Sequence, residues 1–573
     1  MLDFKEKYDS KTNERTIYTS LTGKPLMTTP QLNKSTAFSQ QERMDFGLLG
    51  KLPARIETLD EQVKRAYKQY MSYESKLKRN IYLNNLHDTN QVLFYKLVGE
   101  YLEEMLPTIY TPIVDTAVKE FSTHFRQPRG LYISYNDREH IEAMLENRSN
   151  PEIDIIVVTD GEGVLGIGDQ GIGGIDIPIA KLMVYTLCAG INPLRTLPIQ
   201  LDMGTNNQTL LTDPLYLGWR HERVSGQDYD EFVDDFIQAL KKKLPGAFLH
   251  WEDFGRNNAR RLLDKYRDVH CSFNDDIQGT GAVAVAALLA AINANQTSLT
   301  EQRIVVFGAG TAGTGIADQI HAVMVSQGLT TQQAYERFWL VDRPGLLLDN
   351  MLDLTPAQQP FGRKAEEIEA WQLQNPERID LLDVVLNVKP SILIGCSAVP
   401  GAFTQEIIQT MAADTARPII FPLSNPTEIA EATPSDILSW TDGKALIATG
   451  SPFEPVDYNG RRVHIAQCNN ALIFPGIGLG VLAAKASRLT DQMIWAASYA
   501  LSEFAPINQD PLAPLLPAIA SAKSIAREIA LKVAFQAIND GVAQISEHQD
   551  IHARLAELLW EPKYARLVKT SSY

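Results

Sequence analysis

Residues 39–106 show a helical pattern of hydrophobic and polar positions. Between residues 39 and 106, apolar side chains recur at spacings of three and four, which is typical of helices with one buried face. Pro107 is expected to end the last of these helices. Residues 1–40 are polar and rich in turn-forming residues, and they predict an extended arm. The chain is therefore expected to begin with an arm and continue into a helical region.

From about Gly130 onwards, short apolar runs alternate with helical stretches. The first series of expected strands lies in 153–169, where a glycine-rich turn follows the strand, and in 196–205 and 247–254. The second series lies in 303–310, 338–345, 391–398, 418–426 and 445–451. Strands that alternate with helices favour parallel sheets covered by helices on both faces. After residue 451 the pattern is again helical. The polar C-terminal residues 561–573 are expected to wrap around a neighbouring subunit.

The charge balance narrows the class of partner. Across 573 residues, Asp and Glu outnumber Lys and Arg by 69 to 53, which gives a formal net charge of −16. Proteins that bind nucleic acids or anionic membranes usually present a basic face. We therefore expect neither a nucleic-acid partner nor a membrane partner.

Cysteine usage and apolar runs suggest the compartment. The four cysteines are far apart and form no CxxC pair, so we expect no disulfide framework and a reducing cytoplasm. The polar N-terminus lacks the apolar segment of a signal peptide. The longest apolar runs, 282–292 and 471–484, fall short of the ~20 residues that a membrane-spanning helix needs.

A glycine-rich loop follows the first strand of the second series. The segment RIVVFGAGTAGTG places Gly308, Gly310 and Gly313 between an apolar strand and a helical pattern. This is the dinucleotide-binding pattern, in which the glycines allow a tight turn, close approach of a pyrophosphate and close packing of helix on strand. Asp342 ends the next strand, where an acid binds the ribose 2′-hydroxyl and favours NAD over NADP, although the adjacent Arg343 weakens that argument. The alternative is a glycine-rich turn without a ligand.

Two acidic pairs stand at the ends of apolar segments. Glu252 and Asp253 stand at the end of the expected strand in 247–254, and Asp275 and Asp276 precede a long apolar helix. Buried carboxylates must be paired or bound to a cation, and oxygen ligands without His or Cys suit Mg²⁺ or Mn²⁺. The alternative is that they cap helices and form salt bridges.

Lys181 is the one charged residue between Asp176 and Arg195, in a stretch that predicts a buried helix. Loss of hydration disfavours the charged amine, which makes Lys181 a candidate general base; the alternative is a lysine that reaches out to solvent. The glycine-rich segment 160–174 before it allows close approach of a small anion or of another backbone.

Three further polar residues say little when taken one by one. Tyr110 stands before a Thr-Pro pair, and Asn425 and Asn470 follow apolar stretches or turns. A tyrosine in this position is normally just a packed aromatic side chain. The asparagines could bind a carboxylate or a nicotinamide amide, or merely cap turns.

Together these motifs resemble those of the large malic enzymes, especially the bacterial NAD-linked type. The matching segments, in the family's order and over about residues 30–565, are IYTP (109–112), VVTDGEGVLGIGDQGIGG (157–174), LDMGTNNQTLLTDPLYLGWRH (201–221), WEDF (251–254), FNDDIQGTG (273–281), GAGTAG (308–313), PLSNPT (422–427), ATGSPF (448–453) and QCNNALIFPGIGLG (467–480). The resemblance implies oxidative decarboxylation of L-malate to pyruvate and CO₂ with reduction of NAD.

The resemblance also implies a role for each matching position. Glu252, Asp253 and Asp276 would bind Mg²⁺ or Mn²⁺. Lys181 would take the proton of the C2 hydroxyl, with Asp275 nearby to set its charge. Tyr110 would protonate C3 of enolpyruvate. Asn425 and Asn470 would contact the substrate or the nicotinamide.

The implied architecture is α/β, with a helical N-terminal region, a parallel-sheet substrate domain and a Rossmann-type NAD-binding domain. The expected boundaries are 1–130 (helical N-terminal and oligomerisation region), 131–280 (first part of the substrate and metal domain), 281–466 (NAD-binding domain), 467–540 (return segment of the substrate domain) and 541–573 (C-terminal tail). The implied assembly is a homotetramer built as a dimer of dimers.

One departure from the family pattern keeps a second activity open. Many malic enzymes have Arg directly after the Glu of the TDGE segment, where it grips a malate carboxylate, whereas this chain has Gly163. The related malolactic enzymes also lack that arginine and make L-lactate directly from L-malate with bound NAD. Asp176, where many malic enzymes have Gly, favours the same alternative. A non-catalytic malate or NAD sensor is a third hypothesis, which intact Tyr110 and Lys181 argue against.

Overall fold

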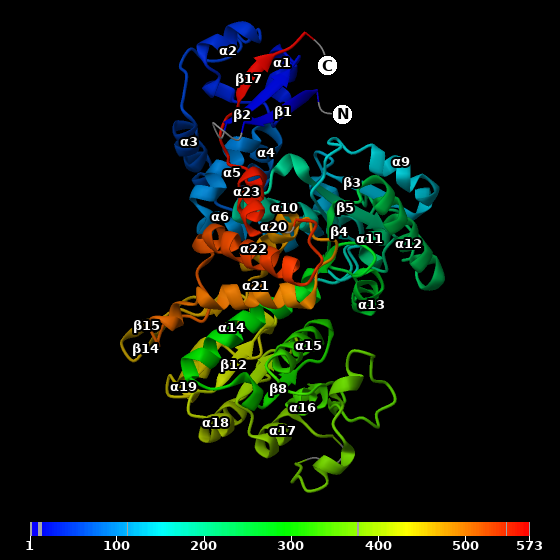
Figure 1. Cartoon of the computed structure of the whole chain (residues 1–573), viewed down its shortest axis with the longest axis vertical. Coiled ribbons are helices and arrows are strands. Elements are labelled where there is room, and N and C mark those ends of the chain that lie inside the picture. The colour runs from blue at the N-terminus through cyan, green and yellow to red at the C-terminus, as the bar shows by residue number, and fades with distance from the viewer. Residues whose placement is uncertain (1–2, 10–13, 112, 375–377, 546, 572–573) are drawn as a thin grey trace. The chain divides into compact units, whose positions relative to one another are not determined.

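The computed structural model describes residues 3–9, 14–111, 113–374, 378–545 and 547–571 (Figure 1). The chain forms two compact units. The first contains residues 1–252 and 547–573, and the second contains residues 253–546. Pro112, the last residue of the IYTP motif, lies outside the described residues.

The two ends of the chain meet in a small sheet of the first unit. Strands β1 (Phe4–Asp9) and β2 (Glu14–Thr19) pair antiparallel, and β17 (Arg566–Lys569) pairs parallel to β2, so that blue and red strands lie side by side in Figure 1. Phe4, Ile17 and Leu567 join one buried apolar cluster there. The expectation of an extended N-terminal arm was therefore wrong, because apolar side chains from both ends bury one another. That the tail wraps around a neighbouring subunit stays a prediction.

The helical N-terminal region is confirmed. After α1 (Gly23–Thr28) and α2 (Gln40–Asp45) come α3 (Leu59–Met71), α4 (Lys76–Thr89), α5 (Gln91–Glu100) and α6 (Leu102–Ile109). Pro107 lies inside α6 and does not end it. The break comes earlier, at Tyr101 between α5 and α6, and the last turn of α6 is closed by Tyr110 N–H, which donates to the Leu106 carbonyl (2.9 Å).

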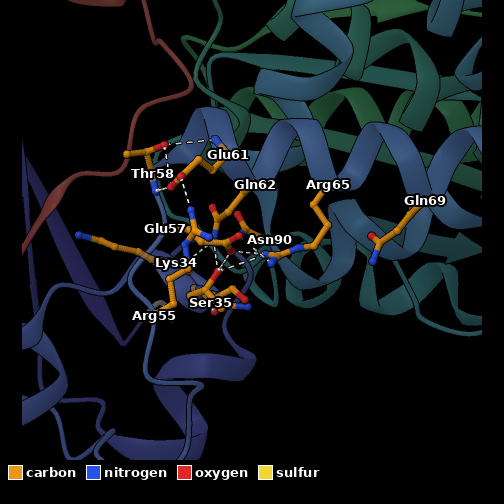
Figure 2. Close-up of polar contacts among 12 residues, drawn as sticks. Lys34, Ser35, Arg55, Glu57, Thr58, Glu61, Gln62, Arg65, Gln69 and Asn90 are labelled. Carbon is orange, nitrogen blue, oxygen red and sulfur yellow. Dashed lines mark hydrogen bonds and ion pairs between the residues drawn. The ribbon is translucent and has the colours of Figure 1, made fainter.

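Polar contacts tie the start of α3 to the preceding loop (Figure 2). A further hydrogen bond ties it to the C-terminal segment. The Thr58 hydroxyl accepts from Glu61 N–H, while the Glu61 carboxylate accepts from Thr58 N–H, which is a capping box. The Gln62 amide donates to the Lys34 carbonyl (2.9 Å) and accepts from the Tyr564 hydroxyl (2.7 Å). These bonds fix the helix start without exposing its backbone donors.

The rest of the first unit surrounds a parallel sheet. Its elements are α7 (Ile113–Lys119), α8 (Phe121–His124), β3 (Leu131–Ser134), α9 (Ile141–Glu146), β4 (Ile155–Thr159), α10 (Asp176–Ala189), β5 (Thr196–Asp202), α11 (Gln208–Thr212), α12 (Gly226–Lys243), β6 (Phe248–Trp251) and α23 (His548–Leu558). The strands lie in the order β3–β5–β4–β6, all parallel, and every residue of β4 and β6 is buried.

The second unit contains a larger sheet and a set of helices. Its elements are α13 (Arg256–Tyr266), β7 (Ser272–Asn274), α14 (Thr280–Asn295), β8 (Ile304–Phe307), α15 (Thr311–Ser326), α16 (Thr331–Tyr335), β9 (Phe338–Asp342), β10 (Gly345–Leu346), α17 (Leu381–Val388), β11 (Ile392–Gly395), α18 (Gln405–Asp414), β12 (Ile419–Pro422), α19 (Pro434–Trp440), β13 (Leu446–Thr449), β14 (Val456–Tyr458), β15 (Arg461–Val463), β16 (Ala466–Gln467), α20 (Phe474–Ala484), α21 (Asp491–Glu503) and α22 (Ala522–Asn539).

The order of this sheet is that of a Rossmann-type fold. It reads β10–β9–β8–β11–β12–β13–β16, with β8 paired parallel to both β9 and β11. Only the short edge strand β10 runs antiparallel to its neighbour among the described strands of this sheet. Side chains of α17, α18 and α19 pack on one face against Val305, Leu393 and Ile420. The expected Rossmann-type domain is therefore confirmed.

Two helical segments of the described chain are long and apolar enough to cross a membrane by length and composition alone, Gly171–Ala189 and Asp275–Asn295. In each segment, 83% of the most apolar 18-residue stretch is buried inside the protein, which is also typical of core helices in soluble proteins. These segments are therefore weak evidence for membrane insertion. All four cysteines are free thiols, in agreement with the expected lack of disulfides.

Candidate active site

Four polar side chains meet inside the first unit between α10 and β6. Lys181 Nζ lies 3.0 Å from Glu252 Oε1, and Glu252 Oε2 lies 2.7 Å from His250 Nε2. The other ring nitrogen of His250 lies 2.9 Å from the Tyr185 hydroxyl. All four residues are at most 2% exposed. The alternative of a lysine that reaches out to solvent is therefore excluded, and the amine is held by a buried carboxylate.

Tyr110 belongs to the same neighbourhood. It is the residue at which α6 ends, and it is buried. Lys181 Nζ lies 5.3 Å from the centre of its ring, within the range of a cation–π contact. The structure thus brings two of the sequence-predicted catalytic residues together.

The glycine-rich segment 160–174 is held in place by a buried arginine. The Arg223 guanidinium donates two hydrogen bonds to the Asp169 carboxylate (2.6 and 3.1 Å) and one to the Asp160 carbonyl (3.1 Å). The Tyr229 hydroxyl donates to the Asp160 carboxylate (2.9 Å). Burial raises the pKa of Asp160 to about 6, although the charge of Arg223 opposes that rise.

The tight packing of this segment explains part of its glycine content. Gly161 has a positive φ of 66°, and a Cβ there would lie 2.3 Å from the Gly171 carbonyl oxygen. The sequence allowed either a small anion or another backbone segment to approach this glycine-rich segment. At Gly161 the structure places the backbone of Gly171.

In the second unit, the acidic residues Asp253 and Asp276 adjoin one another. Asp253 N–H donates to Asp276 Oδ2 (2.8 Å), and both side chains are buried. Asp253 has a positive φ of 55°, which is uncommon for a residue with a side chain and is concentrated at functional sites. Asp253 also directly follows Glu252 in the sequence.

Asp275 and Asp276 begin a single π-helical turn, Asp275–Gly279, that leads into α14. The cap of this turn is Asn274, whose side chain accepts from Ile277 N–H (3.0 Å). N-capping therefore does not account for the two aspartates. The Asn470 amide donates to Asp275 Oδ2 (2.9 Å) and to the Thr280 hydroxyl (3.1 Å), so Asn470 fixes Asp275.

The glycine loop lies between β8 and α15, as expected. A Cβ on Gly313 would lie 2.0 Å from the Gly308 carbonyl oxygen, so only glycine lets the helix start this close to the strand. A Cβ on Gly310, the residue before α15, would meet nothing within 4 Å. The loop therefore has both the close packing and the open approach that a pyrophosphate at a helix N-terminus requires.

Asp342 ends β9 and is tied to this loop. Its carboxylate accepts from Arg343 N–H (2.8 Å) and from the Gln358 amide (3.3 Å). The same Gln358 amide donates to the Ala309 carbonyl (2.8 Å) inside the glycine loop. Gln358 therefore sets the distance between the candidate pyrophosphate site and the candidate ribose site.

Other residues follow the carboxyl ends of β11, β12 and β13. Asn425 Oδ1 accepts from the Ser451 hydroxyl (3.1 Å). The fully buried Glu431 accepts from Ser397 N–H and from the Ser397 hydroxyl (both 2.8 Å), and from the Ser424 hydroxyl (2.5 Å). Glu431 thus links the loops after β11 and β12, the edge at which open α/β sheets bind ligands.

Sequence reasoning missed His250, Tyr185, Arg223 and Glu431. Signals for the first two were present, because His250 stands two residues before Glu252 on a strand and Tyr185 stands four residues after Lys181 on a helix. Both spacings place side chains on one face. Nothing in the spacing of Arg223 or Glu431 indicates their partners.

Known protein families and named relatives match most of the chain. The family description "malic enzyme, N-terminal domain" matches residues 87–267, and "malic enzyme, NAD binding domain" matches residues 277–538. A protein of Acinetobacter baylyi named NAD-dependent malic enzyme is 50% identical, over 97% of this chain and 98% of its own length. A protein of Shewanella frigidimarina with the same name is also 50% identical, over 98% of this chain and 99% of its own.

Solved structures show the same fold. The crystal structure of Entamoeba histolytica malic enzyme matches with a TM-score of 0.54 at 23% identity, covering 90% of this chain and 92% of that chain. The malic enzyme of Pyrococcus horikoshii Ot3 matches with a TM-score of 0.52 at 21% identity, covering 80% and 89%. At these identities the structures support the fold, while the two relatives at 50% identity decide the family. This chain belongs to the malic enzyme family.

Proposed function

We propose that this protein is an NAD-dependent malic enzyme, which converts L-malate and NAD to pyruvate, CO₂ and NADH. The observation that carries the proposal is the buried Lys181–Glu252 pair beside Tyr110 (3.0 Å from Nζ to Oε1), in a chain whose second unit has a dinucleotide-binding fold. A buried base and a buried phenol in contact are what a reaction with one proton removed and one proton returned requires.

We assign the divalent cation, Mg²⁺ or Mn²⁺, to Glu252, Asp253 and Asp276. The donor set supports this, because hard cations prefer carboxylate oxygens. The contact between Asp253 and Asp276, the strained backbone of Asp253 and the covalent adjacency of Glu252 to Asp253 support it further. Asp275 and Asn470 then stand beside this site through their mutual hydrogen bond.

When bound, the cation would polarise the C2 oxygen of malate, and NAD would accept the hydride from C2. Lys181 takes the proton of the C2 hydroxyl. Its position is set by Glu252, which holds the amine from one side, and by the Tyr110 ring on another. A general base of this kind contributes typically ~10²–10⁴-fold in rate.

Tyr110 returns a proton to C3 once the C3–C4 bond has broken and CO₂ has left. The phenol supplies the proton that enolpyruvate needs to become pyruvate, and Lys181, which holds the proton of the C2 hydroxyl, lies next to the ring. Asn425 and Asn470 remain our candidates for contacts to the nicotinamide or the substrate.

NAD is assigned to Gly308, Gly310, Gly313 and Asp342. The open space at Gly310 and the carboxylate at the end of β9 support this assignment. A carboxylate at that place hydrogen-bonds a ribose 2′-hydroxyl and repels a 2′-phosphate, so we propose NAD rather than NADP as the preferred cofactor.

The expected domain boundaries, a homotetramer built as a dimer of dimers and a cytoplasmic location are also part of the proposal. The family membership supports the assembly, and the acidic charge and the free thiols support the location. Light scattering coupled to gel filtration tests the tetramer, since a mass near that of one chain would contradict it.

Gly163 is the observation that favours malolactic activity as a second candidate. The buried arginine of this loop, Arg223, is held by Asp160 and Asp169, so it does not substitute for a substrate-binding arginine after Glu162. The two activities differ in products. Purified protein with L-malate, Mn²⁺ and NAD should form NADH and pyruvate in equal amounts. L-Lactate without net NADH would establish the malolactic reaction, and no product at all would refute both.

A further inference from the structure

At the candidate site of the first unit, a helix and a strand each present two polar side chains, and the distance between the two is nearly the same on both elements. On α10, Lys181 and Tyr185 are four residues apart, which corresponds to a rise of ~6 Å along a helix. On β6 and the residue after it, His250 and Glu252 are two residues apart, which corresponds to ~6.6 Å along a strand. Both spacings place the two side chains on one face.

The pairing is crosswise along the sequence. Lys181 bonds to Glu252 and Tyr185 bonds to His250, so the earlier helix residue meets the later strand residue. The helix therefore runs opposite to the strand, as a helix packed on a parallel sheet does. The backbone geometry alone places the two donors of the helix, the Lys181 amine and the Tyr185 hydroxyl, opposite their two partners. The hydrogen bond between His250 and Glu252 links those partners to each other.

The direction of the hydrogen bonds follows from the chemistry of the groups. A carboxylate only accepts, so His250 Nε2–H donates to Glu252 Oε2 (2.7 Å). In the neutral ring, Nδ1 then accepts from the Tyr185 hydroxyl (2.9 Å). Tyr185 thus selects the tautomer that points a donor at Glu252.

We propose that His250, oriented by Tyr185, is a positioning residue: it fixes the rotation of the Glu252 carboxylate, so that one oxygen faces Lys181 and the carboxylate is presented to the divalent cation in a single orientation. The proposal rests on the proposed function, in which Glu252 is a metal ligand. Partners that orient a metal ligand typically change metal affinity or activity by ~10–100-fold when they are removed.

A purely structural role for His250 makes a different prediction. At 0% exposure, the ring fills space between α10 and β6, and an apolar side chain of similar size would preserve that packing. A packing role would therefore tolerate His250→Leu and would be indifferent to the hydrogen bond. A positioning role requires a donor at the place of Nε2, which a Gln amide supplies and Leu does not.

The test measures Mn²⁺ binding directly, by electron paramagnetic resonance of the free aqueous ion in titrations of the full-length protein without substrate. We expect His250→Leu to weaken Mn²⁺ binding by about 10-fold to 100-fold, and His250→Gln to restore most of the affinity. Tyr185→Phe should produce a smaller loss in the same direction. NAD binding, followed by fluorescence, should be unchanged in all three variants, because the dinucleotide loop belongs to the second unit.

The outcomes separate the inference from the function on which it rests. Unchanged Mn²⁺ affinity in a folded His250→Leu variant, beside a parent that binds Mn²⁺ and turns over malate, overturns the positioning role alone. A parent that does not bind Mn²⁺ overturns the metal assignment and this inference with it. If His250→Leu does not fold, His250→Asn takes its place, because the shorter Asn amide lies at the position of Nδ1 and does not reach that of Nε2. A lower Mn²⁺ affinity for His250→Asn than for His250→Gln supports the inference. Equal Mn²⁺ affinities overturn it.

Discussion

Replacing Arg223 with Met tests how the glycine-rich segment is held. The change keeps most of the side-chain volume and removes the charge that lies between Asp160 and Asp169. The Arg223 side chain is 3% exposed and that of Asp160 is 0% exposed, so solvent cannot replace the lost partner. Breaking a buried ion pair from one side costs roughly 3–5 kcal/mol, a large part of the ~5–15 kcal/mol by which a domain is stable.

The loss should depend on pH in a defined direction. Burial already raises the pKa of Asp160 to about 6 from an ordinary value of 3.8, so in the parent its charge costs stability as the pH rises from about 4 to 6. Arg223 lowers that pKa, so without it the pKa rises further. The additional penalty of the variant therefore develops above pH 6, at ~1.4 kcal/mol for each further unit of pKa.

Urea unfolding followed by circular dichroism at pH 5 and pH 8 measures this penalty. Arg220→Met is the matched control, because Arg220 is exposed and binds only carbonyl oxygens, at Pro214 and Tyr216, among the hydrogen bonds that the structure describes for it. It should change stability by no more than ~0.5 kcal/mol. Adding Asp160→Asn to Arg223→Met should remove the pH dependence. The reasoning fails if Arg223→Met is as stable as Arg220→Met, or if its penalty is the same at both pH values.

Three further changes test the candidate site. Lys181→Ala should lower kcat by at least ~100-fold while NAD binding measured by fluorescence survives, and unchanged turnover would remove the lysine from the mechanism. Asp342→Ser should shift kcat/KM towards NADP, unless the parent already uses NADP as well as NAD, in which case the assignment of this acid is wrong. Gly313→Ala should lower the melting temperature of the second unit, because the new Cβ would lie 2.0 Å from the Gly308 carbonyl oxygen. Gly310→Ala should weaken NAD binding and leave the melting temperature unchanged, because its Cβ would meet nothing within 4 Å. Equal melting temperatures for the two variants would contradict this prediction.

The architecture could be predicted from the sequence because its signals are local. Apolar spacing identified the helices between 39 and 106. Each of the eight segments expected to form a strand between 153 and 451 contains one observed strand, namely β4, β5, β6, β8, β9, β11, β12 or β13, and extends beyond it. Missed strands are short or belong to edges, as β10 and β16 do. The terminal sheet was missed because β2 and β17 are more than 500 residues apart, and nothing local indicates that they pair.

The chemistry of the site was predictable in its residue types and less so in its contacts. Lys181 and the acidic pairs were identified by their isolation in apolar surroundings. The partner of Lys181 within the first unit, Glu252, depends on the register of α10 against β6, which no sequence spacing specifies. The same applies to His250 and Arg223, whose neighbours are set by packing between distant segments. The role of Asp275 towards Lys181 stays a prediction.

The fate of the hydrogen at C2 of malate tests the central claim most directly. L-Malate carrying deuterium at C2 is incubated with the full-length protein, Mn²⁺ and NAD, and the products are analysed by mass spectrometry. Transfer to a released nicotinamide predicts one deuterium in NADH and none in pyruvate. L-Lactate that keeps the deuterium at C2, with no labelled NADH, would contradict the account.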